Sequence, residues 1–290
     1  MATDEIHAQP IDPSRRALGT GSVRVHVVQT GRLVGNRTFL RGEGWSSLLR
    51  RREDVEFPVY SYILEQPDGL VAIDAGMTAR VRVRRLQRRF VPSPVIEPHE
   101  EIGPQLRARG LRPEDVRRVV VTHLDWDHMG GIAHFPNAEV LVHRPEYAFA
   151  SSFGGRQRYQ PRLWPGDLAP TLYDLRPEPY GPFPASAPLP GSGDARLVPI
   201  PGHSIGQVGL IVPTDGGALF FTGDHLLRQD WFLEDYPAGR LVQLGVFFRR
   251  QAIETSRRIR RLTHELPTVL LPAHDADAPA RLAAMAPCPR

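Results

Sequence analysis

The stretch "VVVTHLDWDHMGG", residues 119–131, decides how this sequence is interpreted. A run of β-branched residues, typical of a buried strand, stops at a histidine, and four metal-capable side chains then fall within six residues. In an extended segment alternate side chains share a face, so His123, Asp125 and Asp127 are expected to point one way. The intervening leucine and tryptophan would then pack in apolar surroundings, and one loop could serve two metals.

Further predicted strands end in a residue of the same kind. Asp74 follows "VAI", His203 follows "VPIPG", Asp224 follows "LFFTG" and His274 follows "VLLPA". Because strand ends from one sheet edge can converge on a rigid scaffold, we expect these side chains to meet the 119–131 cluster in one site. Imidazole and carboxylate ligands without thiolates suit zinc, iron or manganese, and open coordination positions suit catalysis.

The composition indicates a soluble, cytoplasmic protein. With 290 residues, 41% of them hydrophobic, the chain can bury a core as one domain spanning 1–290, with residues 1–20 expected to be a flexible N-terminus. The single cysteine, Cys288, excludes an intramolecular disulfide and a thiolate metal cluster. No apolar window approaches the roughly 20 residues of a membrane span, so no membrane partner is expected.

The charge pattern does not favour nucleic acid as a partner. The net charge is +4, and all 36 basic residues are arginine, a bias that we attribute to a GC-rich genome. Arginine runs at 48–54, 80–89 and 257–262 keep a nuclease or phosphodiesterase open as an alternative. The last run lies in a predicted amphipathic helix, so its arginines more simply form a solvated face. The buried stripe of that helix would comprise Ile253, Ile259, Leu262 and Leu266.

The order of the predicted elements indicates a sandwich. Residues 59–76 form two strands around a Pro-Asp-Gly turn, a helix near 99–110 ends at a glycine, and an arginine-rich helix covers 249–266. Strands and then helices occur twice over, which predicts two sheets packed face to face with helices outside. Residues 151–195 lack a sustained period and are expected to be an irregular lid or binding loop, or a disordered insertion.

The ordered set of motifs resembles the metallo-β-lactamase superfamily and, within it, the acyl-homoserine lactonase branch. The pieces that carry the resemblance are "IDAGM", "THLDWDHMGG", "PGHSIGQVGL", "FFTGDHLL" and "LPAHD", spread over most of the chain. The resemblance implies a single-domain αββα four-layer sandwich with two divalent metal ions between its sheets, with zinc expected first and iron or manganese as alternatives. One metal would be held by His123, Asp125 and His203, the other by Asp127, His128 and His274, with Asp224 bridging both and Asp74 bracing the loop through hydrogen bonds.

One ligand departs from the family's pattern, which has histidine where Asp125 stands. An aspartate can ligate, but its charge makes the site less positive and its harder oxygen shifts preference toward iron or manganese. The alternative is that Asp125 does not ligate and one metal is weak or absent. His225, next to the bridging aspartate, is the other imidazole that could replace it.

The resemblance also implies the chemistry. Two metals lower the pKa of a bridging water and supply hydroxide to the carbonyl of an ester, lactone or thioester, and Asp127 could relay the proton to the leaving group. The lactonases carry a tyrosine at the position of Leu227, so Tyr236 or an aromatic of 151–195 would have to replace it. A non-catalytic member that binds a ligand or a protein partner is the remaining alternative.

The aromatic residues of the chain bear on its partners. Those of 151–195, with Trp45 and Phe57, could roof an apolar pocket for a small-molecule substrate. The same residues could instead form the contact of a homodimer.

Overall fold

The structure is a computed structural model that describes residues 24–36, 54–82, 92–159, 164, 168–234 and 249–289. Several predictions lie outside the described residues. They concern residues 1–20, Trp45, Tyr236 and most of the arginine runs at 48–54 and 80–89.

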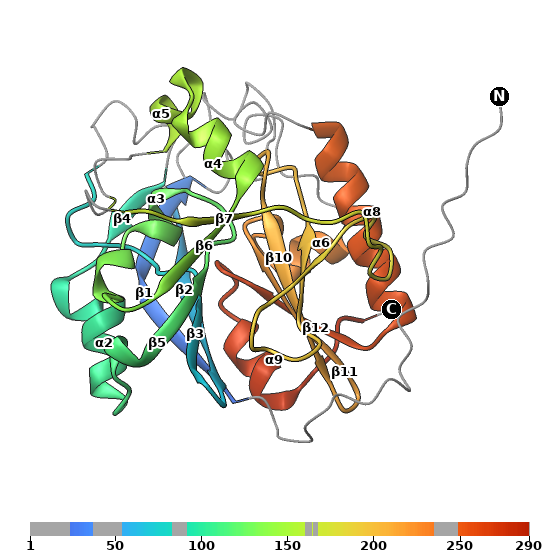
Figure 1. Cartoon of the computed structure of the whole chain (residues 1–290), viewed down its shortest axis with the longest axis horizontal. Coiled ribbons are helices and arrows are strands. Elements are labelled where there is room, and N and C mark those ends of the chain that lie inside the picture. The colour runs from blue at the N-terminus through green and yellow to red at the C-terminus, as the bar shows by residue number, and fades with distance from the viewer. Residues whose placement is uncertain are drawn as a thin grey trace.

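Two sheets form the centre of the molecule (Figure 1). The first has the order β4 (Ser93–Val95), β1 (Val25–Asn36), β2 (Asp54–Gln66), β3 (Gly69–Ile73), β5 (Val116–Val120), β6 (Glu139–His143) and β7 (Thr171–Tyr173). The second has the order β12 (Thr268–Pro272), β11 (Gly217–Gly223), β10 (Val208–Thr214), β9 (Arg196–Pro199) and β8 (Ala187–Pro188). Both sheets mix parallel and antiparallel pairs.

The helices lie on the outer faces of the sheets and at their ends (Figure 1). They are α2 (Ile102–Ala108), α3 (Trp126–Met129), α4 (Arg144–Ser151), α5 (Phe153–Arg158), α6 (Gln229–Leu233), α8 (Arg249–Glu265) and α9 (Ala278–Ala284), with 3-10 turns η3 (Pro98–Glu100), η4 (Pro113–Asp115) and η5 (Ile132–His134). None of the helices in the described ranges combines the length and hydrophobicity that a membrane crossing requires.

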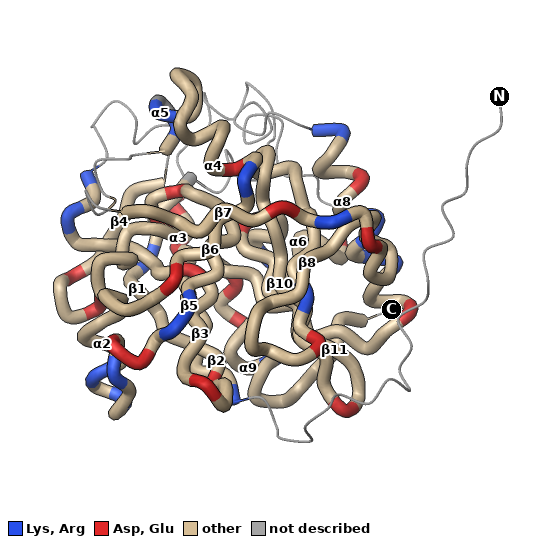
Figure 2. The backbone as a smooth tube through the Cα atoms, viewed as in Figure 1, with Lys and Arg blue, Asp and Glu red and all other residues tan. Residues whose placement is uncertain are grey.

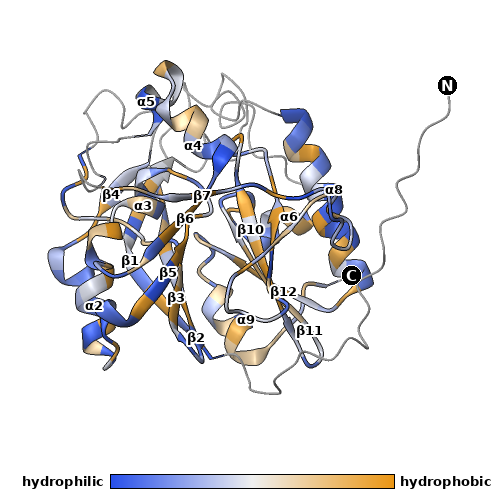
Figure 3. Cartoon of the chain, viewed as in Figure 1, coloured by the Kyte–Doolittle hydropathy of each residue, from blue (hydrophilic) through white to orange (hydrophobic). Residues whose placement is uncertain are grey.

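Alternation along the strands divides the core into three layers. In β11, Leu219 and Phe221 face the other sheet, while Phe220 faces Ile259 and Leu262 of α8. On the far side of the first sheet, α2 and α3 cover the opposite face of β3 and β5. The apolar residues of the strands accordingly lie inside the sandwich in Figure 3. The predicted αββα architecture is confirmed.

The predictions for the hairpin and for two of the helices hold, with an error at Ile253. The 59–76 hairpin is β2 and β3, and Gly110 ends the α2 segment with a φ of 74°. In α8, Ile259 and Leu262 are buried as predicted, but Ile253 is 41% exposed. The buried position on that turn is taken by Thr255, whose hydroxyl donates to the carbonyl of Pro201, so a hydrogen bond rather than an apolar contact holds the start of the helix.

Residues 151–195 are not uniformly irregular. They include α5, the edge strand β7 of the first sheet and β8 of the second. The segment therefore passes from one sheet to the other between their edge strands, as the yellow-green chain in Figure 1 shows. Its role as a lid stays a prediction.

Candidate metal centre

All seven residues predicted as ligands meet at one end of the sandwich. The first sheet supplies those that follow β5, and the second supplies those that follow β9, β11 and β12. Their ligand atoms form two groups, in each of which all atoms lie within 4.8 Å of one another. The four-residue group comprises Asp127, His128, Asp224 and His274, and the three-residue group comprises His123, Asp125 and His203.

The loop after β5 does not stay extended, as the sequence analysis assumed. Residues 126–129 form the short helix α3, with Asp125 as its N-cap, so Asp127 and His128 lie on a helical turn. Because of this turn, Asp127 lies in the four-residue group while Asp125 lies in the three-residue group. The intervening Leu124 and Trp126 are buried in two different apolar clusters, as predicted.

The two glycines after α3 allow that helix to approach the loop after β3. A Cβ on Gly131 would lie 2.2 Å from the carbonyl oxygen of Ala75, and one on Gly130 would lie 2.8 Å from the amide nitrogen of Thr78. The amide of Ala75 donates to the carbonyl of His128 at 2.7 Å. The backbone contact therefore fixes His128 against the loop that carries Asp74.

The four-residue group has the geometry of a set of metal ligands. The Nε2 atoms of His128 and His274 each lie 3.0 Å from Oδ1 of Asp224, and His274 Nε2 lies 3.4 Å from Oδ2 of Asp127. Ligands at about 2.0–2.1 Å around one tetrahedral ion would stand about 3.3 Å apart. Both Nε2 atoms and Asp224 Oδ1 are buried and make no hydrogen bond to the described residues. A divalent cation satisfies all three, so the residues fit a metal ion.

Each imidazole of this group is oriented from behind. The Nδ1 atom of His128 lies 2.7 Å from Asp74, and Nδ1 of His274 lies 2.8 Å from the carbonyl of Pro58. The Asp74 carboxylate also accepts hydrogen bonds from the amide and the hydroxyl of Thr122, both at 2.8 Å. The backbone of Asp74 itself is left-handed, with a φ of 59°. These bonds direct both Nε2 atoms inward, and the hydrogen bonds predicted for Asp74 are present.

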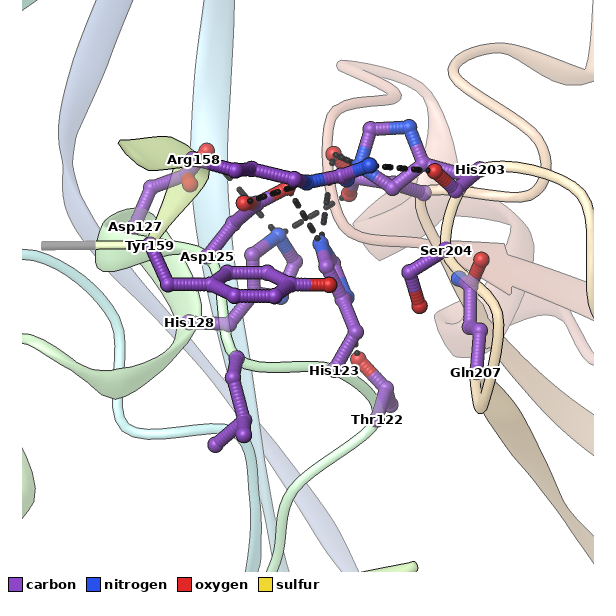
Figure 4. A network of polar contacts seen from close by, with 12 residues as sticks. Thr122, His123, Asp125, Asp127, His128, Arg158, Tyr159, His203, Ser204 and Gln207 are labelled. Atoms are coloured by element: carbon purple, nitrogen blue, oxygen red, sulfur yellow. Dashed lines mark hydrogen bonds and ion pairs between the residues drawn. The ribbon is translucent and has the colours of Figure 1, made fainter. Parts of the chain in front are cut away.

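The three-residue group is built differently, because an arginine side chain is bonded to its aspartate (Figure 4). The Nε and Nη2 atoms of Arg158 donate to the two oxygens of Asp125, at 3.1 and 2.7 Å. Nε2 of His203 lies 2.9 Å from the same Asp125 Oδ2, and Nε2 of His123 lies 3.3 Å from it. Of the three ligand side chains, only His123 has a ligand nitrogen that is buried without a hydrogen bond to the described residues.

Asp224 lies between the two groups. Its Oδ1 faces His128 and His274 at 3.0 Å, while its Oδ2 lies 3.8 Å from Nε2 of His203 and 4.0 Å from Nε2 of His123. A carboxylate with one oxygen toward each group can serve ions in both. This arrangement is consistent with the bridging role expected for Asp224.

Neighbouring charges shift the pKa values of the side chains in both groups. Burial would raise the pKa of the Asp125 carboxyl, but Arg158, the hydrogen bond from His203 and the nearby His123 hold that pKa well below its usual value. Burial would lower the pKa of His274, yet the Asp224 and Asp127 carboxylates raise that pKa to about 10. The carboxylates of the four-residue group thus favour a positive charge at its centre, whereas Asp125 already has a cation beside it in Arg158.

A buried carboxylate that the sequence analysis missed ties the loops together. Glu146 in α4 accepts from the amides of Leu124 and Gly206 and from the hydroxyls of Tyr159 and Ser204, at 2.7 to 3.1 Å. These donors belong to the loop of His123, the loop of His203 and the end of α5. In the sequence, Glu146 looks like an ordinary acidic residue of a helix first turn, so no local signal marks it.

Arg158 was missed for a similar reason, since a single arginine carries no information in an arginine-rich chain.

Two residues that were considered as replacements for missing family residues have other partners. His225 belongs to neither group, and its Nε2 lies 3.1 Å from the hydroxyl of Ser256 in α8. The hydroxyl of Tyr159 is committed to Glu146, so this tyrosine does not stand in for the one absent at Leu227.

Two sheets with helices outside and histidines and aspartates gathered at one end define a metal-dependent hydrolase. The chain belongs to the metallo-beta-lactamase superfamily, whose family model matches residues 54–274. A Mycobacterium tuberculosis protein named a probable metallo-hydrolase is 30% identical over 234 residues, 74% of each chain. An N-acyl homoserine lactonase of Rhizobium radiobacter is 27% identical over 271 residues, 88% of this chain and 94% of the lactonase.

The fold is also similar to that of a solved lactonase. An N-acyl homoserine lactone hydrolase with the product N-hexanoyl-L-homoserine at its catalytic metal centre aligns with a TM-score of 0.69, over 88% of this chain and 94% of that one. The sequence identity is 21%, so this likeness concerns the fold.

Proposed function

We propose that this protein hydrolyses a carboxylic ester bond, in a lactone, an ester or a thioester of a small molecule. The observation that carries the proposal is the set of buried ligand atoms of His128, His274 and Asp224 that converge without hydrogen bonds to the described residues. Keeping such atoms in a folded protein is expensive unless a cation satisfies them. The same cost argues against a non-catalytic scaffold.

The proposed ligands are the seven residues of the two groups, with Asp224 shared. Zinc fits the imidazole and carboxylate donors, and iron or manganese fit the added carboxylate of Asp125. When bound, divalent metals in such a centre activate a water and polarise a carbonyl oxygen. Asp127 is the candidate for moving a proton to the leaving group. Its side chain is buried at the centre, and its Oδ2 lies 3.4 Å from Nε2 of His274 in the same group.

Among these substrates a lactone comes first, because lactonases recur among the relatives. One of them, the N-acyl homoserine lactonase of Rhizobium radiobacter, aligns with 88% of this chain. The residue at 227 is leucine, so the carbonyl of a lactone would need another donor than the tyrosine implied by the resemblance. Residues 151–195 bring Arg158 to the centre, which supports a role for this segment as a cover over the substrate.

The described arginines give little support to a nuclease or phosphodiesterase. In α8, Arg258 pairs with Glu254 at 3.3 Å and Arg261 with Glu265 at 2.6 Å. Figure 2 shows basic and acidic segments interleaved along that helix. A phosphate-binding surface would need basic charge without such neutralisation.

The test is a substrate panel with zinc-, iron- and manganese-loaded protein. The panel holds acyl-homoserine lactones, simple lactones, aryl esters, thioesters and a phosphodiester, with Asp224→Asn as the inactive control. We expect turnover of at least one carboxylic substrate that disappears in the variant. Turnover of the phosphodiester alone, or none that depends on Asp224, would overturn the proposal.

A further inference from the structure

The arginine at the three-residue group carries an inference that rests on the proposed function and deepens it. We propose that Arg158 is a built-in cation of the three-residue group and competes there with a metal ion. The centre would then bind one ion tightly at the four-residue group and a second ion weakly. The two halves of a site that the resemblance presents as equal would differ in this protein.

Arg158 occupies both oxygens of the Asp125 ligand. Its two nitrogens take both oxygens of Asp125 in a bidentate pair, at 3.1 and 2.7 Å. Oδ2 is the oxygen that faces both imidazole nitrogens of the group, and it is also the oxygen at the shorter distance from the guanidinium. A metal ion among these ligands would have to share the same lone pairs with a permanent cation.

The two groups also differ in charge. The four-residue group holds the carboxylates of Asp127 and Asp224, which match one divalent ion. The three-residue group holds the single carboxylate of Asp125, and its charge is already matched by Arg158. Since arginine does not lose its proton in proteins, the charge of Asp125 stays compensated, and an ion entering this group brings its own charge close to the guanidinium.

Arg158 is held in place by its own contacts and is not a surface side chain that happens to reach the site. Its Nη1 donates to the carbonyl of His203 at 2.8 Å, and its guanidinium lies 5.1 Å from the centre of the Tyr159 ring. That ring is fully buried, and its hydroxyl is bonded to Glu146. The Arg158 side chain is 16% exposed, against 53% for Arg144 in a comparable pair with Asp174.

The arginine and the aspartate therefore belong together. Histidine at 125 would remove the carboxylate that Arg158 pairs with in this structure, and Asp125 without Arg158 would add an anion to the metal centre. The pair keeps the three-residue group neutral without a second ion.

The experiment is a zinc titration of metal-stripped protein against a chromophoric chelator, which reports the number of bound ions and both affinities without using activity. For the native protein we expect one tight and one weak zinc, at least about tenfold apart. Arg158→Gln should tighten the second zinc by about tenfold or more and leave the first unchanged. Arg158→Met, which preserves length without charge, provides a second variant if the first does not fold.

The matched control is Arg144→Gln, which breaks an arginine–aspartate pair on the neighbouring helix α4 and should change neither affinity. Two equally tight zinc ions in the native protein would overturn the inference while leaving the proposed function standing. So would an unchanged or weaker second zinc in both Arg158 variants. No zinc bound in the native protein would overturn the proposed function as well.

Discussion

The two groups of candidate ligands share a carboxylate and lie at the same end of the sandwich, yet they are completed in different ways. In the four-residue group, the Nε2 atoms of His128 and His274 converge at 3.0 Å on one oxygen of Asp224, and neither makes a hydrogen bond to the described residues. In the three-residue group, Asp125 is bonded by Arg158 and by His203. Ligand-type residues alone therefore do not define equivalent metal sites, because the partners of each ligand decide how much cation it still needs.

The partners also differ in what they orient. Asp74 and the carbonyl of Pro58 direct the imidazoles of the four-residue group toward its centre. Glu146 instead fixes the loops beneath the three-residue group through four donors. One group is thus prepared for an ion by its ligands' own hydrogen bonds, and the other is held in shape by a buried carboxylate.

The largest expected effect is at the four-residue group. Replacing His128 or His274 by alanine removes a ligand of the tightly held ion, so turnover should fall to background. His203→Ala, in the three-residue group, should retain measurable turnover because the ion bound there is the weaker one. The measurement is kcat/KM on the best ester or lactone substrate, with metal content and circular dichroism in parallel.

Equal losses in the two groups would contradict the asymmetry. Undiminished turnover in a folded His128 or His274 variant would remove the four-residue group from the mechanism altogether.

The second effect separates the groups without touching a ligand. Asp74→Asn removes the charge behind His128 while keeping a residue that tolerates the φ of 59°. We expect the tight zinc to weaken by about 10- to 100-fold, as for other partners of metal-binding histidines, and the weak zinc to change little. The chelator titration measures both, and a larger loss at the weak zinc would be the contrary result.

The third effect is on stability and concerns the other group. Glu146→Gln places an amide nitrogen against donors that now meet a carboxylate, and leaving buried donors unsatisfied should cost about 2–3 kcal/mol of unfolding free energy. Urea unfolding of the metal-stripped protein provides the measurement.

The matched control is Glu101→Gln, which neutralises a carboxylate that accepts from Ala79 and Thr78 outside both groups. Glu101→Gln should leave the affinity of the weak zinc unchanged, whereas Glu146→Gln should change that affinity. A Glu146 variant as stable as the native protein would argue against the bracing role.

The smallest effect tests the link between Glu146 and Arg158. Tyr159→Phe removes one buried hydroxyl bond of 2.7 Å and should cost about 1 kcal/mol. Tyr62→Phe removes a buried bond of the same length to Pro272 and should cost a similar amount. Only the Tyr159 variant should also change the affinity of the weak zinc, and identical titrations of the two variants would break the link.

Much of the site could be predicted because each ligand follows a strand. His123, His203, Asp224 and His274 come after buried apolar runs, and strands of packed sheets end at a common edge. The error concerned the segment after Asp125, where the sequence analysis assumed an extended chain and the structure has α3. Its local pattern of alternating apolar and acidic residues fits a strand, and the close approach permitted by Gly130 and Gly131 selects the helical turn.

By itself, the sequence determined the family, the two-sheet fold and the seven residues that meet at its edge, because these depend on local patterns of apolar and metal-capable residues. Only the tertiary structure decided that Arg158 pairs with Asp125 and that Glu146 bonds four distant donors. The physical reason is that such partners lie tens of residues apart and are chosen by packing. A charged residue has no pattern of its own until the fold shows which opposite charge or donor it meets.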